Sequence, residues 1–300
     1  MRYPHHVAIC ISVALAAGVW GLYWLPQREL EAAGLTGGWG TLAQFVLPFI
    51  AMTPFMIWRW RRHGLVTGAR WILTGVLLGG GIVFYANSFL LTDVVRALLL
   101  FYITPVWATL LEIFVLKQAV AKSRYITLVL ALAGVWVVFG QDGGFPIPEN
   151  AGDWLALAAG AMIAGGAARV NATQPDSPLP ILYAFYLYGS IIALALGAAL
   201  HASLGPSPPV EALWAMLPFL LVLVFALLMP TNGLLIWAPA KIGAGVFGIL
   251  ILSEVVTGAI SAALLANESF GWHEAIGCFL ILAAGTFEVV MSNRRESPQS

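Results

Sequence analysis

One carboxylate, Glu254, lies about half-way along the apolar run 242–265. If this run crosses a membrane, ionising Glu254 there costs a few kcal/mol, and ionisable residues at such a depth are usually functional. We therefore expect Glu254 to exchange a proton when another molecule binds beside it. The alternative is a neutral carboxyl group that hydrogen-bonds between helices, to a serine such as Ser253 or to a backbone carbonyl. Ser253 itself could contact a ligand or bond back to the preceding turn.

A second chemical feature is Pro105, which interrupts the apolar run 93–116 near its middle. Proline removes one backbone hydrogen bond and frees a carbonyl upstream. Such breaks at membrane depth usually face protein or a water-filled cavity. Tyr102 and Thr104 flank the break, so both could bind the amino or carboxyl group of a small molecule.

Further polar and aromatic side chains lie deep in other apolar runs. For Asn87 and Asn232, the alternative to ligand binding is an interhelical hydrogen bond, worth about 0.6 kcal/mol on average. Aromatic residues near the middle of runs could form a cage for flat molecules or cations, or they could simply pack. The candidate substrate-binding residues are Trp20, Tyr85, Asn87, Tyr102, Thr104, Pro105, Asn232, Trp237 and Ser253.

The composition excludes a soluble protein. Of the 300 residues, 60% are hydrophobic and 9% are charged, whereas a soluble domain has about 25% charged residues. The 14 basic and 14 acidic residues balance, which argues against a nucleic-acid partner. A phosphate-binding loop, a dinucleotide fingerprint and a nucleophile elbow are all missing from the sequence. His273-Glu274 lacks a second histidine, and Cys10 and Cys278 lie in apolar runs, so we expect no metal, no cofactor and no enzyme activity.

The elements that must position these residues are membrane-spanning helices of about 20 residues each. Polar breaks divide the chain into ten such runs, of which the eighth contains Pro218 and Pro230 and is expected to be kinked or broken. The fold class is therefore an all-α integral membrane protein. The predicted spans are 7–26, 39–58, 69–90, 93–116, 123–140, 152–171, 179–200, 212–238, 242–265 and 271–291.

Positive charge predicts the orientation, because basic residues gather on the cytoplasmic side. With the N-terminus inside, all of the 14 basic residues except Arg28 and Arg96 lie on the inner side. We therefore predict cytoplasmic N- and C-termini in a plasma (inner) membrane protein. Arg96 and Asp93 lie at i and i+3 near the outer end of the fourth span, where they can form an ion pair.

The two halves of the chain resemble each other. Three stretches of the first half align in sequence, in the same order, with stretches of the second half. They are Leu98–Gln118 with the stretch from Phe247, Leu130–Val138 with a stretch ending near Val290, and Leu15–Trp20 with Leu157–Met162. Five spans per half is an odd number, so the second half must be inverted, as in many transporters. The predicted units are residues 1–145, residues 146–291 and a cytoplasmic tail, 292–300.

The chain resembles the drug/metabolite transporter superfamily in its ten-helix EamA branch. The resemblance rests on Trp20-Gly21, on the short hairpin leading into TPVWATLLEIFVL and on the GVWVVFG ending of the fifth span. The aromatic residues and the ANSFLLT stretch are most similar to YddG-type aromatic amino-acid exporters. Members of the branch often have proline where this chain has Glu254.

The inverted halves predict a secondary transporter that works by alternating access, and the resemblance implies that it exports aromatic or neutral amino acids and related metabolites. Its partners would be a small-molecule substrate, protons and the bilayer, with a monomer sufficient because one chain holds both halves. One alternative is an efflux transporter for drugs or organic cations, which the carboxylate and aromatic residues favour. An intramembrane enzyme or a membrane scaffold is the alternative of another class, which the short loops and the missing catalytic motifs oppose.

Overall fold

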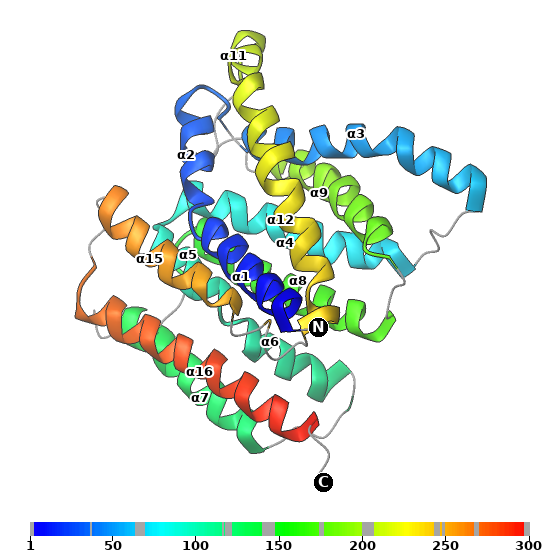
Figure 1. Ribbon diagram of the computed structural model, residues 1–300. Coiled ribbons are helices and arrows are strands. Elements are labelled where there is room, and N and C mark those ends of the chain that lie inside the picture. The colour runs from blue at the N-terminus through cyan, green and yellow to red at the C-terminus, as the bar shows by residue number, and fades with distance from the viewer. Residues whose placement is uncertain are drawn as a thin grey trace.

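The chain is helical throughout the part that the structure describes (Figure 1). This structure is a computed structural model, and it describes residues 3–36, 38–63, 70–115, 117, 122–139, 148–173, 177–199, 207–242, 247, 250–266 and 270–296. Seven helical stretches there are long and apolar enough to cross a membrane, and three shorter apolar helices accompany them. The predicted all-helical membrane class is therefore confirmed. The ten-span count stays a prediction, because the three shorter helices fall on the fifth, ninth and tenth predicted runs.

The first half contains two interrupted spans. A turn at residues 21–23 separates the two helices of the first span, and a turn at 102–103 divides the fourth. The break predicted near Pro105 is thus present, since this proline lies in the first turn of the helix that follows. The helices are α1 (Tyr3–Trp20), α2 (Trp24–Ala32), α3 (Trp39–His63), α4 (Arg70–Leu91), α5 (Val94–Phe101), α6 (Thr104–Leu110), a π-helical turn (Leu111–Val115) and α7 (Lys122–Phe139).

In the second half, the proline-containing eighth run stays helical over Val210–Trp237. A π-helical segment lies between Pro218 and Pro230 and widens the helix locally, and the predicted kink stays a prediction. The boundary predicted between residues 145 and 146 lies outside the described residues. The helices are α8 (Ala151–Thr173), α9 (Leu179–Ala199), α11 (Val210–Leu221), the π-helix (Val222–Leu228), α12 (Met229–Trp237), α13 (Pro239–Ile242), α15 (Ser253–Leu265) and α16 (Trp272–Glu296).

Helices from the two halves alternate in the packing (Figure 1). α4 packs along both α8 and α9, α9 packs on α3, and α8 also contacts α5 and α6. α1 packs on α15 and α12, while α7 and α16 form a pair at one side of the molecule. The interior is therefore built between the halves rather than within each of them.

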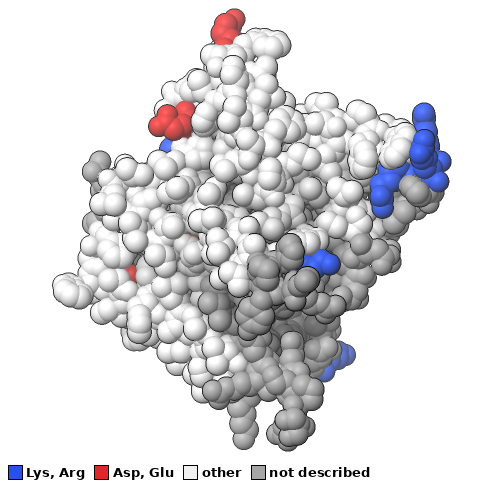
Figure 2. Space-filling view, in the orientation of Figure 1, with Lys and Arg blue, Asp and Glu red and all other residues white. Residues whose placement is uncertain are grey.

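Large apolar side chains cover much of the surface. Leu15, Phe114, Trp136, Leu264 and Phe279 are each more than 60% exposed. The face shown in Figure 2 is largely uncharged, with acidic side chains over α2 and α11 and basic ones at the far end of α3. Water would disfavour so large an apolar surface, whereas lipid tails cover it at no cost.

Glycines allow the helices at the centre to approach closely, and one substitution tests this packing. A Cβ atom on Gly79 of α4 would overlap the Phe185 carbonyl oxygen and lie 2.9 Å from the Gly189 nitrogen of α9. Because both are backbone atoms that cannot move aside, Gly79→Ala should lower the free energy of unfolding by about 1–3 kcal/mol. Reversible unfolding in mixed micelles measures this loss.

The matched control is Gly165→Ala, on α8. There the nearest atom to an added Cβ would be Leu77 Cδ1 at 3.4 Å, which is an ordinary contact. Alanine is also the better helix former by about 1 kcal/mol, so this variant should be as stable as the parent or more so. Equal stability of the two variants would contradict the close packing of α4 on α9.

Candidate functional site

Glu254 lies in the first turn of α15 and its side chain is buried. Tyr85 of α4 donates a hydrogen bond to one carboxylate oxygen, with Oη and Oε1 2.8 Å apart. Tyr102 donates to the other oxygen, again at 2.8 Å. Two hydroxyl donors therefore satisfy one carboxylate, and we call these three residues the clamp. The two tyrosines come from the first half of the chain and the glutamate from the second.

Helix interruptions place the clamp. Tyr102 follows the last residue of α5, and Pro105, the second residue of α6, has no N–H to continue the preceding helix. On the other side, the Tyr102 hydroxyl also lies 3.2 Å from the carbonyl oxygen of Ile251, just before α15 begins. The end of α5 thus faces the start of α15, which is the geometry in which backbone breaks at membrane depth are tolerated.

Aromatic rings fix the orientation of the two tyrosines. Tyr85 stacks on Phe101 with ring centroids 4.1 Å apart and planes 21° apart. Phe101 meets Tyr102 edge-on at 5.4 Å, and Phe89 lies 4.6 Å from Tyr85 on the other side. The carboxylate therefore lies at the end of an aromatic cluster formed by Tyr85, Phe89, Phe101 and Tyr102, whose residues are at most 8% exposed.

Trp20 lies on the α1 side of α15. It is buried against Tyr23, with ring centroids 4.6 Å apart, and its Nε1 has no hydrogen-bond partner among the described residues. A Cβ on the next residue, Gly21, would overlap the Glu254 carbonyl oxygen. Close contact therefore brings the end of α1 to the turn that carries the clamp glutamate.

Ser253 and Thr257 fasten α15 to α1. The Ser253 hydroxyl lies 2.9 Å from the Ala14 carbonyl oxygen and 2.8 Å from that of Leu250. Thr257, one turn further on, lies 2.9 Å from the Gly18 carbonyl oxygen. The structure thus gives Ser253 backbone partners, including the back-bond to its own preceding turn that the sequence left open.

The other predicted residues have different surroundings. Asn87 donates to the Val83 carbonyl at 2.8 Å, while its Oδ1 is buried without a partner among the described residues. Thr104 donates to the Phe101 carbonyl at 2.6 Å. Asn232 donates to the Tyr186 hydroxyl at 3.1 Å, in a separate contact between α12 and α9. The structure therefore brings only part of the predicted set to Glu254.

Trp237 is 37% exposed and lies 5.6 Å from the Lys241 ammonium group, measured to the ring centroid. This contact is at the end of α12, and the ring takes no part in the clamp. Its role in substrate binding stays a prediction.

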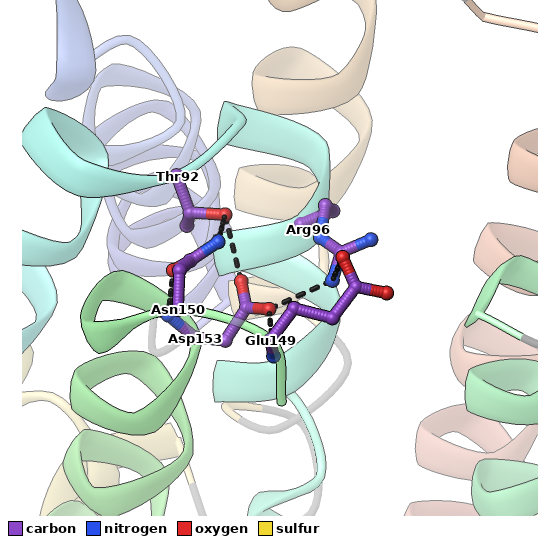
Figure 3. A network of polar contacts seen from close by, with 5 residues as sticks. All are labelled: Thr92, Arg96, Glu149, Asn150 and Asp153. Atoms are coloured by element: carbon purple, nitrogen blue, oxygen red, sulfur yellow. Dashed lines mark hydrogen bonds and ion pairs between the residues drawn. The ribbon is translucent and has the colours of Figure 1, made fainter. Parts of the chain in front are cut away.

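Sequence reasoning missed a network around Asp153 (Figure 3). The Asp153 carboxylate accepts hydrogen bonds from Arg96 Nη2 at 2.7 Å and from Thr92 Oγ1 at 2.7 Å. The backbone N–H of Glu149 adds a third at 3.0 Å, and the Asn150 side chain caps the Asp153 N–H at 2.9 Å. An available indication was the spacing of Asn150 and Asp153, which is that of a helix-capping pair.

A second missed network is neutral. Gln44 Oε1 accepts from the Tyr23 hydroxyl at 2.8 Å and from Gln27 Nε2 at 3.2 Å, while Thr41 donates to Gln27 Oε1 at 3.0 Å. All four side chains are buried between α2 and α3. Because every bond stays within the first half, this network holds the first two spans together.

A group of histidine, cysteine and acidic side chains suited to a metal ion was not found among the described residues.

Comparison with known proteins identifies a similar family. Residues 8–140 match the EamA-like transporter family. The match to this EamA-like family supports membership of the drug/metabolite transporter superfamily, and with it a multi-pass membrane protein that transports small molecules. No curated protein matches the chain.

A solved structure supports the fold along the whole chain. This crystal structure of a protein aligns with 98% of the chain and 99% of its own length, with 20% sequence identity and a TM-score of 0.54. The likeness concerns the fold alone. It includes the part of the chain that follows the EamA-like match, where α15 carries Glu254.

The clamp predicts a difference between two tyrosine substitutions. Tyr85→Phe should lower the free energy of unfolding by about 1–3 kcal/mol, because a buried carboxylate loses a hydrogen-bond donor. Tyr183→Phe is the control, since its hydroxyl lies 3.2 Å from the neutral Thr53 hydroxyl in a partly buried contact. That variant should lose about 1 kcal/mol or less. Unfolding in mixed micelles compares them, and equal losses would show that the carboxylate does not depend on Tyr85.

Proposed function

We propose that this protein is a secondary transporter that exports aromatic or neutral amino acids and related metabolites across the plasma membrane. The observation that carries the proposal is the clamp, in which Glu254 of one half accepts hydrogen bonds from Tyr85 and Tyr102 of the other. A buried, ionisable group shared by two halves is the arrangement that a carrier needs at its substrate site.

The packing supports two related halves that move by alternating access. Under exchange of equivalent spans, the contact of α1 with α15 corresponds to that of α8 with α5 and α6. Likewise, the contact of α1 with α12 corresponds to that of α8 with α4. Such interchangeable contacts are what inverted repeats would give, and two unequal arrangements of them would open opposite sides in turn.

The chemistry of the clamp explains how a substrate would engage it. An amino group can donate to the Glu254 carboxylate and so compete with the tyrosine hydroxyls, while an aromatic side chain would pack on the rings of Phe101 and the tyrosines where separation of the two halves exposes them. A proton competes for the same carboxylate. Substrate and proton would then exclude each other at Glu254, which couples their movements in opposite directions.

Efflux of organic cations is the second candidate. The clamp residues supply a carboxylate and ring faces but no basic side chain to hold the carboxylate of an amino acid. A flat cation would need only the groups that are present. Competition between phenylalanine and a flat aromatic cation for the same uptake distinguishes the two candidates.

Transport in liposomes tests the proposal. The purified protein should take up a subset of radiolabelled amino acids saturably, and an imposed pH gradient should change the rate. Glu254→Gln should remove the response to the pH gradient, because the amide group of glutamine does not titrate as a carboxyl group does. Glu211→Gln is the control, since this side chain is exposed at the start of α11.

Two results would contradict the proposal. Absence of uptake for the whole amino-acid panel, with uptake of the flat cation, would replace the first candidate by the second. A gradient response that survives Glu254→Gln would remove the coupling role of Glu254 and leave the carrier itself in place.

A further inference from the structure

Asp153 holds the outer end of the same two helices that carry the clamp tyrosines. It lies in the first turn of α8, in the second half of the chain. Its carboxylate receives Thr92, from the turn between α4 and α5, and Arg96, from the first turn of α5, each at 2.7 Å (Figure 3). The α4–α5 hairpin is therefore fastened to the second half at two levels, by Asp153 and by Glu254.

The attachment at Asp153 is a buried one. Its side chain is 0% exposed and that of Arg96 is 21% exposed, whereas the Glu149 side chain is 68% exposed and lies 3.5 Å from Arg96. Separating the partners of a buried ion pair leaves an uncompensated charge, which is costly. The two side chains therefore stay together. An exposed pair such as Arg96–Glu149 contributes little.

A short, packed helix, α5, connects the Asp153 contact with the clamp. It includes Arg96, ends one residue before Tyr102, and all its residues other than Arg96 are buried. Six residues of α-helix span about 9 Å. A displacement of the Arg96 end therefore reaches the Tyr102 hydroxyl with no flexible segment between them.

α8 follows the hairpin along this length. A Cβ on Gly152 would lie 2.8–2.9 Å from atoms of Leu91 and Thr92. One on Gly160 would lie 2.6 Å from the Phe101 carbonyl oxygen. The contact between α8 and the hairpin is thus close at both ends of α5. The hairpin meets α15 through side chains instead: a Cβ on Gly258 would lie 2.5 Å from Leu98 Cδ1, which is a flexible side-chain atom, and the clamp adds hydroxyl groups that a ligand can replace.

We propose that Asp153 is a positioning residue for the substrate site: it fixes the α4–α5 hairpin on α8 and so presents the Tyr85 and Tyr102 hydroxyls together to Glu254. The hairpin and α8 then move as one body, and the separation that admits substrate occurs between the hairpin and α15. The inference rests on the proposed function only in taking the clamp as the substrate site.

Infrared difference spectroscopy tests the positioning without any substrate. The carbonyl band of protonated Glu254, assigned by its loss in Glu254→Gln, reports the hydrogen bonds that this group makes. Asp153→Asn should shift or split the band, because the tyrosine hydroxyls are no longer held at hydrogen-bonding distance from Glu254. Glu149→Gln, which changes only the exposed member of the network, should leave the band unchanged.

Uptake kinetics supply the second readout. Asp153→Asn should raise KM about tenfold in the parent protein. In a Tyr85→Phe/Tyr102→Phe background it should hardly change KM, because the effects of substitutions within one network do not add. If Asp153→Asn fails to fold, Thr92→Val removes one donor to Asp153 at nearly constant volume and should move the same band and KM in the same direction.

An unshifted Glu254 band would overturn the proposal, as would an equal rise of KM in both backgrounds. A parent protein that transports no tested substrate would contradict the proposed function alone. In that case the infrared comparison of Asp153→Asn with Glu149→Gln would still decide the positioning role.

Discussion

The cost of burying a carboxylate in the apolar interior governs this structure. Glu254 is buried away from water, so the protein must supply its hydrogen-bond donors. The two donors are tyrosine hydroxyls, which bring apolar rings into the interior together with one polar group each. Their rings in turn need Phe101 and Phe89 to hold them. The need to satisfy one buried group thus shapes four side chains and the helices that carry them.

Helix ends supply the positions that uninterrupted helices do not offer. Tyr102 lies at the end of α5 and Glu254 at the start of α15, so both side chains leave the helix at a terminus. Between them, the freed carbonyl of Ile251 lies within reach of the Tyr102 hydroxyl. An interruption in an apolar span therefore serves two purposes: it places a polar side chain, and its own backbone group finds a partner there.

Much of this could be predicted from the sequence, since polar residues are conspicuous in apolar runs. Tyr85, Tyr102 and Glu254 were recognised one by one, but their association was not, because 169 and 152 residues separate the tyrosines from the glutamate. Local spacing indicated only Asp93 as a neighbour of Arg96 and gave no sign of Asp153. The structure pairs Arg96 with Asp153, whose buried carboxylate has the greater need of a cation.

The order of synthesis gives the clamp a further meaning. Tyr85 and Tyr102 enter the membrane early, whereas Glu254 emerges from the ribosome only after 152 more residues have been made. The donors are thus already in the bilayer when α15, with an acidic residue in its first turn, has to leave the translocation channel. Inserting that helix into lipid alone costs a few kcal/mol. Hydrogen bonds from the Tyr85 and Tyr102 hydroxyls offset part of this cost. The clamp is then also a contact that favours membrane integration of α15.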